Sequence, residues 1–249
     1  MLVLFVLAVL WPPAAPHYQG KSLNQWLGLY YSSITSGTPA PQAKQAIRQI
    51  GTNALPTLIR MIQAQDSFIK SKLMDVASKQ HFLKLNLTPA STLRFQATMS
   101  YQILGAAAKA QVPELTIILT NDDTDEVSQS AEVRQCAATA LGFIGEEAKP
   151  AAAALLVTAK DEDNQARNSS LWALSRIHAD PALVLPGLIE GLNDSFHIAR
   201  ENAAWALAQY GTLATSAVPT LIRTTNINPA AYAAILTIDP AAVSSTNGK

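Results

Sequence analysis

The chain has 249 residues, of which 49% are hydrophobic and only 14% are charged. Its 18 Lys and Arg residues balance its 18 Asp and Glu residues, so the net charge is zero at pH 7. This composition can bury a continuous core and excludes a disordered chain. Neutrality argues against a nucleic-acid-binding protein, because such proteins use Lys and Arg to neutralise phosphates.

The N-terminus, MLVLFVLAVLWPPAAP, predicts a secretory signal peptide over residues 1–16. The apolar run from Leu2 to Leu10 is about half of the roughly 20 residues that a membrane-spanning helix needs. Its length is typical of the apolar core of a signal peptide. No Lys or Arg precedes the run, so an uncleaved N-terminal anchor is the alternative. We therefore expect an exported protein, periplasmic or secreted, that meets a membrane only through this segment if it is retained.

The segment 17–40 predicts a helix that caps the N-terminal end of the fold. Ser22 can serve as the N-cap of this helix, because its hydroxyl can accept a hydrogen bond from a backbone N–H of the first turn. The apolar residues Leu23, Trp26, Leu27 and Tyr30 would then share one face of the helix.

A repeat occupies most of the remaining chain, 41–249. Arg134, Arg167 and Arg200 are separated by 167 − 134 = 33 and 200 − 167 = 33 residues, and an earlier copy starts at Arg94. Residues three, six, seven and ten positions after each arginine are small or apolar and trace one face of an α-helix. Position eleven ends the helix with a residue that tolerates positive φ. These residues are Gly105, Gly145, His178 and Gly211, and Gly51 ends a first copy without the arginine.

A second helix follows in each unit, and a proline marks its first turn, where a missing N–H costs nothing. Two residues later comes a leucine. Each unit is thus predicted to be a helical hairpin, and alanines on the inner face let neighbouring hairpins stack closely. The prolines are Pro56, Pro113, Pro186 and Pro219, with Ala153 in the third unit, and the leucines are Leu58, Leu115, Leu155, Leu188 and Leu221.

The pattern VRQCAATALGFIG…AAAALLVTAKD resembles the HEAT repeat, in particular the short bacterial type of the phycobilisome lyases. The segment YQGKSLNQWL is similar to the one that precedes such repeats in exported bacterial HEAT-repeat proteins. The resemblance implies an all-α fold: a right-handed α-solenoid of about five HEAT-like helical hairpins with N- and C-terminal capping helices. The segment NPAAYAAILTIDP is interpreted as a shortened last helix.

The resemblance also implies a role for the repeated arginines. Asp161 precedes Arg167 by six residues, and Asp194 precedes Arg200 by the same interval. In HEAT repeats such Asp and Arg residues bond between neighbouring units. We therefore predict a structural inter-repeat ladder, with a binding ladder as the alternative. Its members are Arg134, Asp161, Arg167, Asp194 and Arg200.

The resemblance further implies that the second helices line the concave face of the solenoid, which usually receives the partner. Residues one and four positions after the proline are predicted to point away from the core. This face would carry charged ends and an apolar middle, which suits a protein or peptide better than a polyanion. The candidate partner-binding residues are Arg60, Glu114, Ile117, Val157, Glu190 and Arg223; the apolar middle also includes Ala154 and Gly187, and Thr57 and Thr220 complete the set.

No enzyme signature stands out in the sequence. Metal-dependent HEAT enzymes such as deoxyhypusine hydroxylase use paired His-Glu motifs, whereas the four histidines here precede Tyr18, Phe82, Ala179 and Ile198. There is no zinc spacing, no phosphate-binding loop and no nucleophile with its base. The single cysteine, Cys136, is interpreted as a small buried side chain. We expect no catalytic residue, no metal and no cofactor.

Two irregular stretches interrupt the repeat. The segment from Asp66 to Ser91 is basic and could meet an acidic partner or form a solvated helix face. The segment NDDTDEVSQSAE is interpreted as a solvated acidic insertion, because it lacks the glycine of a calcium loop. The basic residues are Lys70, Lys72, Lys79, His81 and Lys84, with Arg48 and Arg60 upstream, and the acidic ones are Asp122, Asp123, Asp125 and Glu126.

The function predicted from these features is a non-catalytic protein-protein interaction scaffold that binds a protein or peptide along the concave face. The alternative is a lyase- or chaperone-like HEAT protein that acts on a cofactor-bearing protein. A third interpretation, a structural subunit of an envelope complex, differs in how permanent the partner is.

Overall fold

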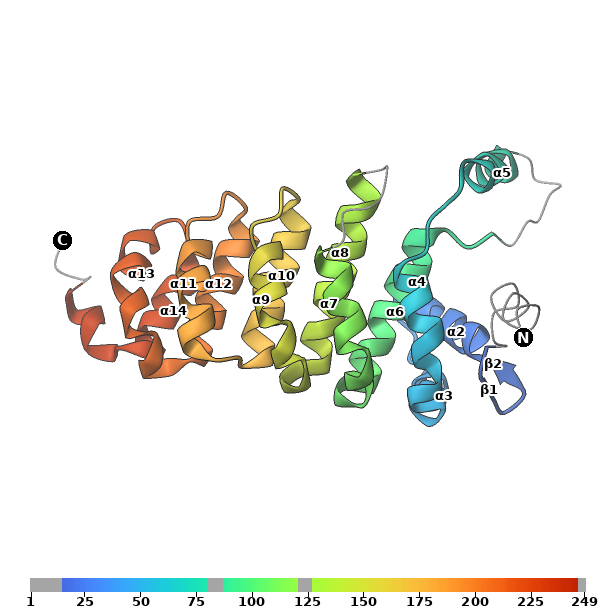
Figure 1. Cartoon of the computed structure of the whole chain (residues 1–249), viewed down its shortest axis with the longest axis horizontal. Helices are drawn as coiled ribbons and strands as arrows, with labels where there is room; N and C mark the ends of the chain where they lie inside the picture. The colour runs from blue at the N-terminus through green and yellow to red at the C-terminus, as the bar shows by residue number, and fades with distance from the viewer. Residues whose placement is uncertain (1–14, 80–86, 121–126, 246–249) are drawn as a thin grey trace, which may run out of the picture.

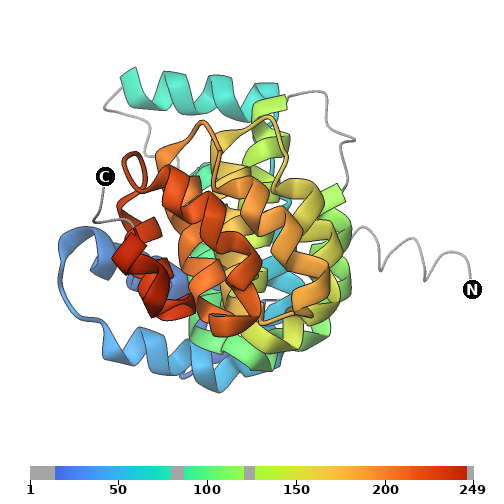
Figure 2. The same ribbon diagram turned by 90° about the vertical axis from the view of Figure 1, so that its left-hand side faces the viewer.

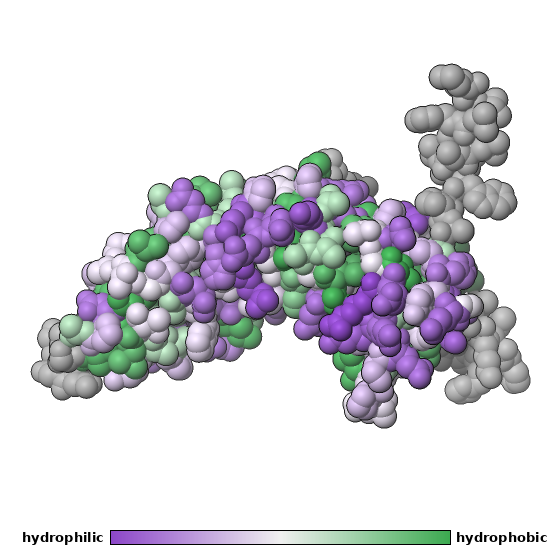
Figure 3. Space-filling view, turned by 90° about the horizontal axis from the view of Figure 1, so that it is seen from below, coloured by the Kyte–Doolittle hydropathy of each residue, from purple (hydrophilic) through white to green (hydrophobic). Residues whose placement is uncertain are grey.

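The computed structural model describes residues 15–79, 87–120 and 127–245. In these residues the chain is almost entirely helical and forms one elongated stack of helices, with the N- and C-terminal elements at opposite ends (Figure 1). Seen from another side, the stack is arched (Figure 3). The all-α solenoid predicted from the sequence is confirmed.

The N-terminal end of the stack is a small hairpin followed by a helix. Strand β1 (His17–Tyr18) pairs antiparallel with β2 (Lys21–Ser22). Helix α2 (Leu23–Ser36) begins at Ser22, which forms a capping box with Gln25. The indole Nε1 of Trp26 donates to the carbonyl of Tyr18 at 2.9 Å, so the hairpin is fastened to the helix. The N-cap was predicted from the sequence, and the hairpin was not.

Five units follow, each with a first helix, a connection and a second helix. First helices pack along one another, as do successive second helices of the middle units. Figure 2 looks along this stack from the C-terminal end. The first helices are α3 (Pro41–Ile50), α6 (Ala90–Leu104), α8 (Val127–Ile144), α10 (Asn164–Ile177) and α12 (His197–Gln209). The second helices are α4 (Leu55–Ile62), α7 (Val112–Thr120), α9 (Ala152–Thr158), α11 (Pro181–Gly191) and α13 (Val218–Thr224).

Four of the five connections are 3₁₀-helices. Each begins at a glycine with positive φ, which ends the first helix and turns the chain toward the second. In the fourth unit His178 takes the left-handed conformation at φ 47°, as its place in the glycine column predicted. The connections are η1 (Gly51–Ala54), η2 (Gly105–Gln111), η3 (Gly145–Ala151) and η4 (Gly211–Ala217).

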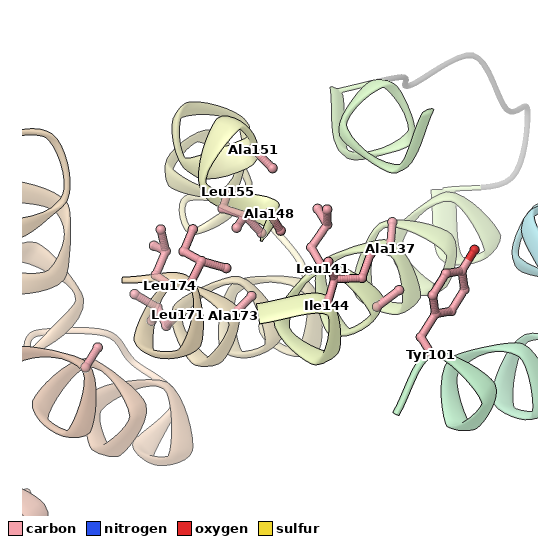
Figure 4. Packing of buried hydrophobic residues seen from close by; sticks show 14 of the residues in the cluster. Tyr101, Ala137, Leu141, Ile144, Ala148, Ala151, Leu155, Leu171, Ala173 and Leu174 are labelled. Carbon is pink, nitrogen blue, oxygen red and sulfur yellow. The ribbon is translucent and has the colours of Figure 1, made fainter. Parts of the chain in front are cut away.

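The core runs unbroken through the stack. The alanine and leucine columns of the first helices face the leucine column of the second helices, and all five of these leucines are fully buried. In Figure 4 Leu141 and Leu174 point toward the neighbouring second helix that carries Leu155, with Ala137 and Ala173 on the same side. Small residues at these positions let the helix backbones approach one another. The alanines are therefore spacers, as the repeat predicted.

The second unit replaces part of this packing with a polar network. Tyr101 stands where the later units have leucine, and its hydroxyl donates to the side chain of Gln111. The amide of Gln111 in turn donates to the carbonyl of Leu55 in the first unit at 2.7 Å. Both side chains are buried, and burial raises the pKa of Tyr101. The network ties the first two units together.

The fourth unit departs from the expected position of its second helix. Asp180 caps the helix through the N–H of Ala182, and Pro181 takes the first position. Helix α11 therefore begins five residues before Pro186, which lies inside it. The prediction that Pro186 marks the first turn was wrong, because an Asp-Pro pair is itself a strong helix start.

The segment that interrupts the repeat between the first and second units contains a helix, α5 (Phe68–Lys79), in agreement with a helix face there. Figure 1 shows α5 standing clear of the stacked helices. His81 and Lys84 lie outside the described residues, as do Asp122, Asp123, Asp125 and Glu126 of the acidic insertion.

Helix α14 (Pro229–Ile238) and the 3₁₀-helix η5 (Pro240–Ser245) close the C-terminal end. Within the described residues, one helical run, Ala90–Thr120, is long and apolar enough to cross a membrane. That run consists of α6, η2 and α7, whose buried side chains belong to the core of the stack. We therefore assign it to the solenoid.

Candidate functional site

The second-helix face is the outward side of α4, α7, α9, α11 and α13. All six candidate partner-binding residues lie on it and are exposed. Five of them follow the buried leucine by two residues and so leave the helix on the opposite side, whereas Glu114 directly precedes Leu115. They are Arg60, Glu114, Ile117, Val157, Glu190 and Arg223.

The middle of the second-helix face is apolar. Ile117 on α7 is 63% exposed, and Val157 on α9 is 64% exposed. The two helices are packed together, so both aliphatic side chains belong to one region of the surface. Single exposed aliphatic residues are common, whereas neighbouring ones on a rigid scaffold are typical of a binding surface.

Two arginines mark the ends of the second-helix face. Residues 56–60 and 219–223 share the sequence Pro-Thr-Leu-Ile-Arg, and the two copies behave alike. Arg60 Nη2 donates to Thr57 Oγ1 at 3.4 Å, and Arg223 Nη2 donates to Thr220 Oγ1 at 3.0 Å. Arg60 Nε also donates to the carbonyl of Pro56 at 3.0 Å. Each guanidinium is thus held along its own helix, and both arginines are exposed.

In three units the residue that directly follows the proline position of the second helix does not point its side chain outward. Thr57, Ala154 and Thr220 are buried, at 8%, 9% and 8% exposure. Each second helix packs against neighbours in adjacent units, and this narrows the exposed strip to the position four residues after the proline. The expectation for position one was therefore wrong for these three residues, while Glu114 is exposed.

Gly187 is half-buried and serves packing. A Cβ at this position would lie 2.5 Å from Cδ2 of Leu156, so the missing side chain lets α9 and α11 approach. The apolar middle therefore narrows to Ile117 and Val157.

Glu190 already has a partner on the second-helix face. Its carboxylate is 2.6 Å from the ammonium of Lys160, and both side chains are 62% exposed. An exposed pair of this kind contributes little to stability. Breaking the Lys160–Glu190 pair to bond a ligand would therefore cost little free energy.

Two pockets meet at Lys160. One of about 470 Å³ lies beside α7 and α9 and includes Val157, and one of about 310 Å³ lies between α9 and α11 and includes Glu190. A third pocket, of about 480 Å³ between α2 and α3, lies elsewhere, and its lining of Trp26, Ser33, Thr38 and their neighbours has no charged side chain. Of the apolar middle, Val157 lines the first of these pockets and Ile117 lines neither of the two at Lys160.

The repeated arginines lie at the edges of the first two pockets and are engaged with the fold. Arg134 Nε is 2.5 Å from Asp161 Oδ2, and Arg167 Nε is 2.7 Å from Asp194 Oδ2, both in two-bonded pairs. Arg167 also donates to the backbone carbonyl of Asp161 at 2.8 Å. Each aspartate lies in the link between two units, so these bonds connect neighbours along the stack.

The pKa values of Asp194 and Arg167 are shifted in opposite directions. Burial disfavours the Asp194 carboxylate, but hydrogen bonds from Arg167 and from the backbone N–H of Phe196, with the charges of Arg167 and Arg200, lower its pKa overall. The hydrogen bond to Asp194 raises the pKa of Arg167. Both groups are therefore held in their charged forms.

The last step of the series differs. Arg200 donates to the carbonyls of Asp194 and Ser195 at 2.7 and 3.0 Å. No aspartate follows it at the equivalent position. Instead the buried Asn228 donates to the carbonyl of Arg200 at 2.9 Å and accepts from the N–H of Ala230 at the start of α14. The sequence analysis missed Asn228, although an Asn-Pro pair 28 residues after Arg200 was a usable signal.

Cys136 is half-buried, and burial raises the pKa of its thiol. Among the residues that the structure describes, no group of three or more His, Cys, Asp or Glu side chains is arranged to hold a metal ion.

One unit of the chain, residues 199–224, matches the family model of the PBS lyase HEAT-like repeat. This stretch runs from α12 through η4 to the end of α13, which is one complete unit. The same sequence columns and the same two-helix unit recur along the stack, so the other units resemble this HEAT-like repeat. No curated protein matches it.

Two designed or engineered proteins are similar in structure. One is a designed armadillo repeat protein in complex with peptide (KR)4, with 16% sequence identity and a TM-score of 0.42 over 85% of this chain and 97% of that one. The other is an engineered protein with 17% identity and a TM-score of 0.39 over 90% of this chain and 92% of that one.

Proposed function

We propose that this protein is a non-catalytic scaffold that binds an extended peptide or a protein segment along its second-helix face. The observation that carries the proposal is the pair of exposed aliphatic side chains, Ile117 and Val157, on neighbouring helices, with Val157 lining a pocket. An apolar centre with charged surroundings is the usual anatomy of a protein interface.

Rigidity supports the same proposal. The second helices are fixed by the buried leucine column and by the Arg–Asp bonds between units. A surface that is already in its binding conformation loses little entropy when a partner docks. The charged ends, Arg60 and Arg223, would orient an extended partner through carboxylate or backbone carbonyl groups.

The experiment is a selection of binding peptides from a random displayed library against the full chain. Affinities of the selected peptides are then measured for the wild type and for the double variant Ile117→Asp/Val157→Asp. We expect the double variant to lose about tenfold or more in affinity, because two buried hot-spot contacts are replaced by charges. The matched control is Leu213→Asp, an exposed residue of η4 outside the second-helix face.

A retained affinity in the double variant, with loss in the control, would contradict the proposal. The variants alter only exposed side chains, so their thermal midpoints are expected to match the wild type. This separates loss of binding from loss of fold.

The family description of residues 199–224 supports a second proposal, a lyase- or chaperone-like protein that acts on a cofactor-bearing substrate. Co-expression with chromophore-bearing proteins of the native host tests it. New chromophore absorbance in the substrate, dependent on this chain, would favour this proposal over the scaffold.

An exported location is also a proposal, supported by the apolar run from Leu2 to Leu10. Fractionation of the native host, with the molecular mass of the mature chain, tests it. A chain of full mass in the cytoplasm would contradict export.

A further inference from the structure

Helix α5 is a surface feature that the second-helix face does not use. It is inserted between α4 of the first unit and α6 of the second, and it stands away from the stack (Figure 1). Phe68, Ile69, Leu73 and Val76 are exposed at 76%, 72%, 43% and 42%. Four large apolar side chains on a protruding 12-residue helix are a substantial exposed cluster.

Three of these residues form a stripe. Ile69, Leu73 and Val76 follow the spacing i, i+4 and i+7, so they share one side of the helix. The side opposite this stripe carries Ser71 and Asp75. Helix α5 is therefore amphipathic, although nothing in the described structure covers its apolar side.

The borders of the stripe are basic. The ammonium of Lys72 lies 5.4 Å from the centre of the Phe68 ring, and Lys70 lies on the other border, 2.6 Å from Asp66. The helix holds three lysines against one aspartate, in a chain whose net charge is zero. Lysines that border an apolar stripe are typical of helices that lie in the headgroup region of a bilayer.

The insertion is held at its base. The carboxylate of Asp66 accepts from the N–H of Ala90, the first residue of α6, at 2.9 and 3.1 Å, while it pairs with Lys70 in α5. Hydrogen bonds from Lys70 and Ala90 oppose the effect of burial and lower the pKa of Asp66 overall. This carboxylate thus fixes where α5 leaves the stack.

The position of α5 agrees with a membrane as its target. The helix protrudes at the end of the stack where β1 and α2 lie (Figure 1). The apolar run Leu2–Leu10 precedes β1 by only a few residues in the sequence. If that run is retained in a bilayer, it connects through β1 to the same end of the stack as α5.

We propose that α5 is an interfacial helix that lays Ile69, Leu73 and Val76 onto the surface of an anionic phospholipid bilayer, with Lys72 directed to the headgroups. The proposal commits to a lipid surface because the stripe lies on a protruding helix and is bordered by lysines, as in helices that bind anionic headgroups. It is independent of peptide binding at the second-helix face.

The test places a fluorophore on each side of α5 in the full chain. Cys136 is first replaced by serine, which the fourth unit already carries as Ser169 at the same repeat position. An environment-sensitive dye is then attached at Leu73→Cys or at Ser71→Cys. These sites lie on nearly opposite sides, since two residues correspond to about 200° of rotation. The dye therefore reports on α5 itself, whatever the N-terminal run does.

The probes are vesicles of phosphatidylglycerol and phosphatidylcholine in equal parts, compared with vesicles of phosphatidylcholine alone. We expect the dye at position 73 to move to a drier environment only with the anionic vesicles, and the dye at position 71 to stay in water. Lys72→Glu should weaken the response by roughly tenfold or more, because a charge near an anionic surface is reversed. Lys149→Glu on η3, an exposed lysine outside α5, is the matched control.

Three outcomes would overturn the proposal. If the dye at position 73 is unchanged while the protein co-floats with anionic vesicles, the contact lies in the N-terminal run alone. An equal response to both vesicle types would remove the role of the lysines. A response to a lipid-free protein fraction, but to no vesicle, would identify a protein as the occupant.

Discussion

The central stack and the α5 insertion use the same apolar spacing with opposite results. In α8 and α10, Ala137, Ala140 and Ala173 are fully buried between helices. In α5, Ile69 and Leu73 stand largely in solvent. Apolar periodicity alone therefore does not distinguish a core helix from a docking helix. The repeat does, because a residue that recurs every 33 positions must meet its copy in the neighbouring unit.

The largest expected contrast comes from truncating one leucine in each region. Leu155→Ala should destabilise the protein by about 3–5 kcal/mol, because it opens a cavity in a closely packed core. Leu73→Ala should change stability by less than about 0.5 kcal/mol, because its side chain is exposed. Urea unfolding of both variants checks this. Equal losses would mean that α5 is packed against the stack in solution.

A smaller loss is expected from the bonds between units. Arg167→Ala should cost about 2–4 kcal/mol, because it leaves the mostly buried Asp194 carboxylate without its partner. Arg223→Ala, which removes an exposed guanidinium, is the matched control and should cost less than about 0.5 kcal/mol. Thermal melts of both proteins decide between a structural ladder and a binding ladder: an unchanged midpoint for Arg167→Ala would favour binding.

Close approach between units can be tested at Gly142. A Cβ there would lie 2.4 Å from the Trp172 ring and 3.1 Å from the Cα of Ala173. Gly142→Ala should therefore destabilise the stack by about 1–3 kcal/mol through overpacking. Gly28→Ala on α2, where an added Cβ meets nothing within 4 Å, is the control and should be neutral or slightly stabilising. Equal melting points for the two variants would show that α8 and α10 are not in close contact.

The smallest effect is a dependence on acid. The pKa of Asp194 lies below its ordinary value of 3.8 in the folded state, so ionised Asp194 favours folding above that pH. This contribution is lost as the pH falls below about 4 through the lowered folded-state pKa. We expect Asp194→Asn to flatten the fall of the thermal midpoint between about pH 5 and pH 3. An unchanged slope would assign acid sensitivity to other carboxylates.

Much of the stack was predictable because its signals repeat. The five buried leucines, the four positive-φ glycines that end first helices and His178 as their substitute all follow from aligned columns. The glycines are Gly51, Gly105, Gly145 and Gly211. The exposed residues of the second-helix face follow from the same alignment. The prediction failed where a local helix-start signal competes with the repeated proline position. Asp180 and Pro181 start α11 ahead of Pro186.

Features that occur once were harder to predict. The Lys160–Glu190 pair joins residues 30 positions apart in different units, and no sequence column marks it. Asn228 replaces an aspartate with a different residue type at a shifted position. Helix α5 has no copy elsewhere in the chain. Its basic residues indicated a solvated helix face, but the sequence analysis did not predict its exposed apolar stripe. Its exposure depends on the three-dimensional path of the insertion.

The central claim is that the second-helix face is the interaction surface of this protein. Amide hydrogen exchange of the full chain, with and without a peptide selected against it, tests this most directly. The account predicts slower exchange in α7 and α9 on peptide binding, with little change in α5 and α10. Protection confined to α5, or to the first helices α8 and α10, would contradict it.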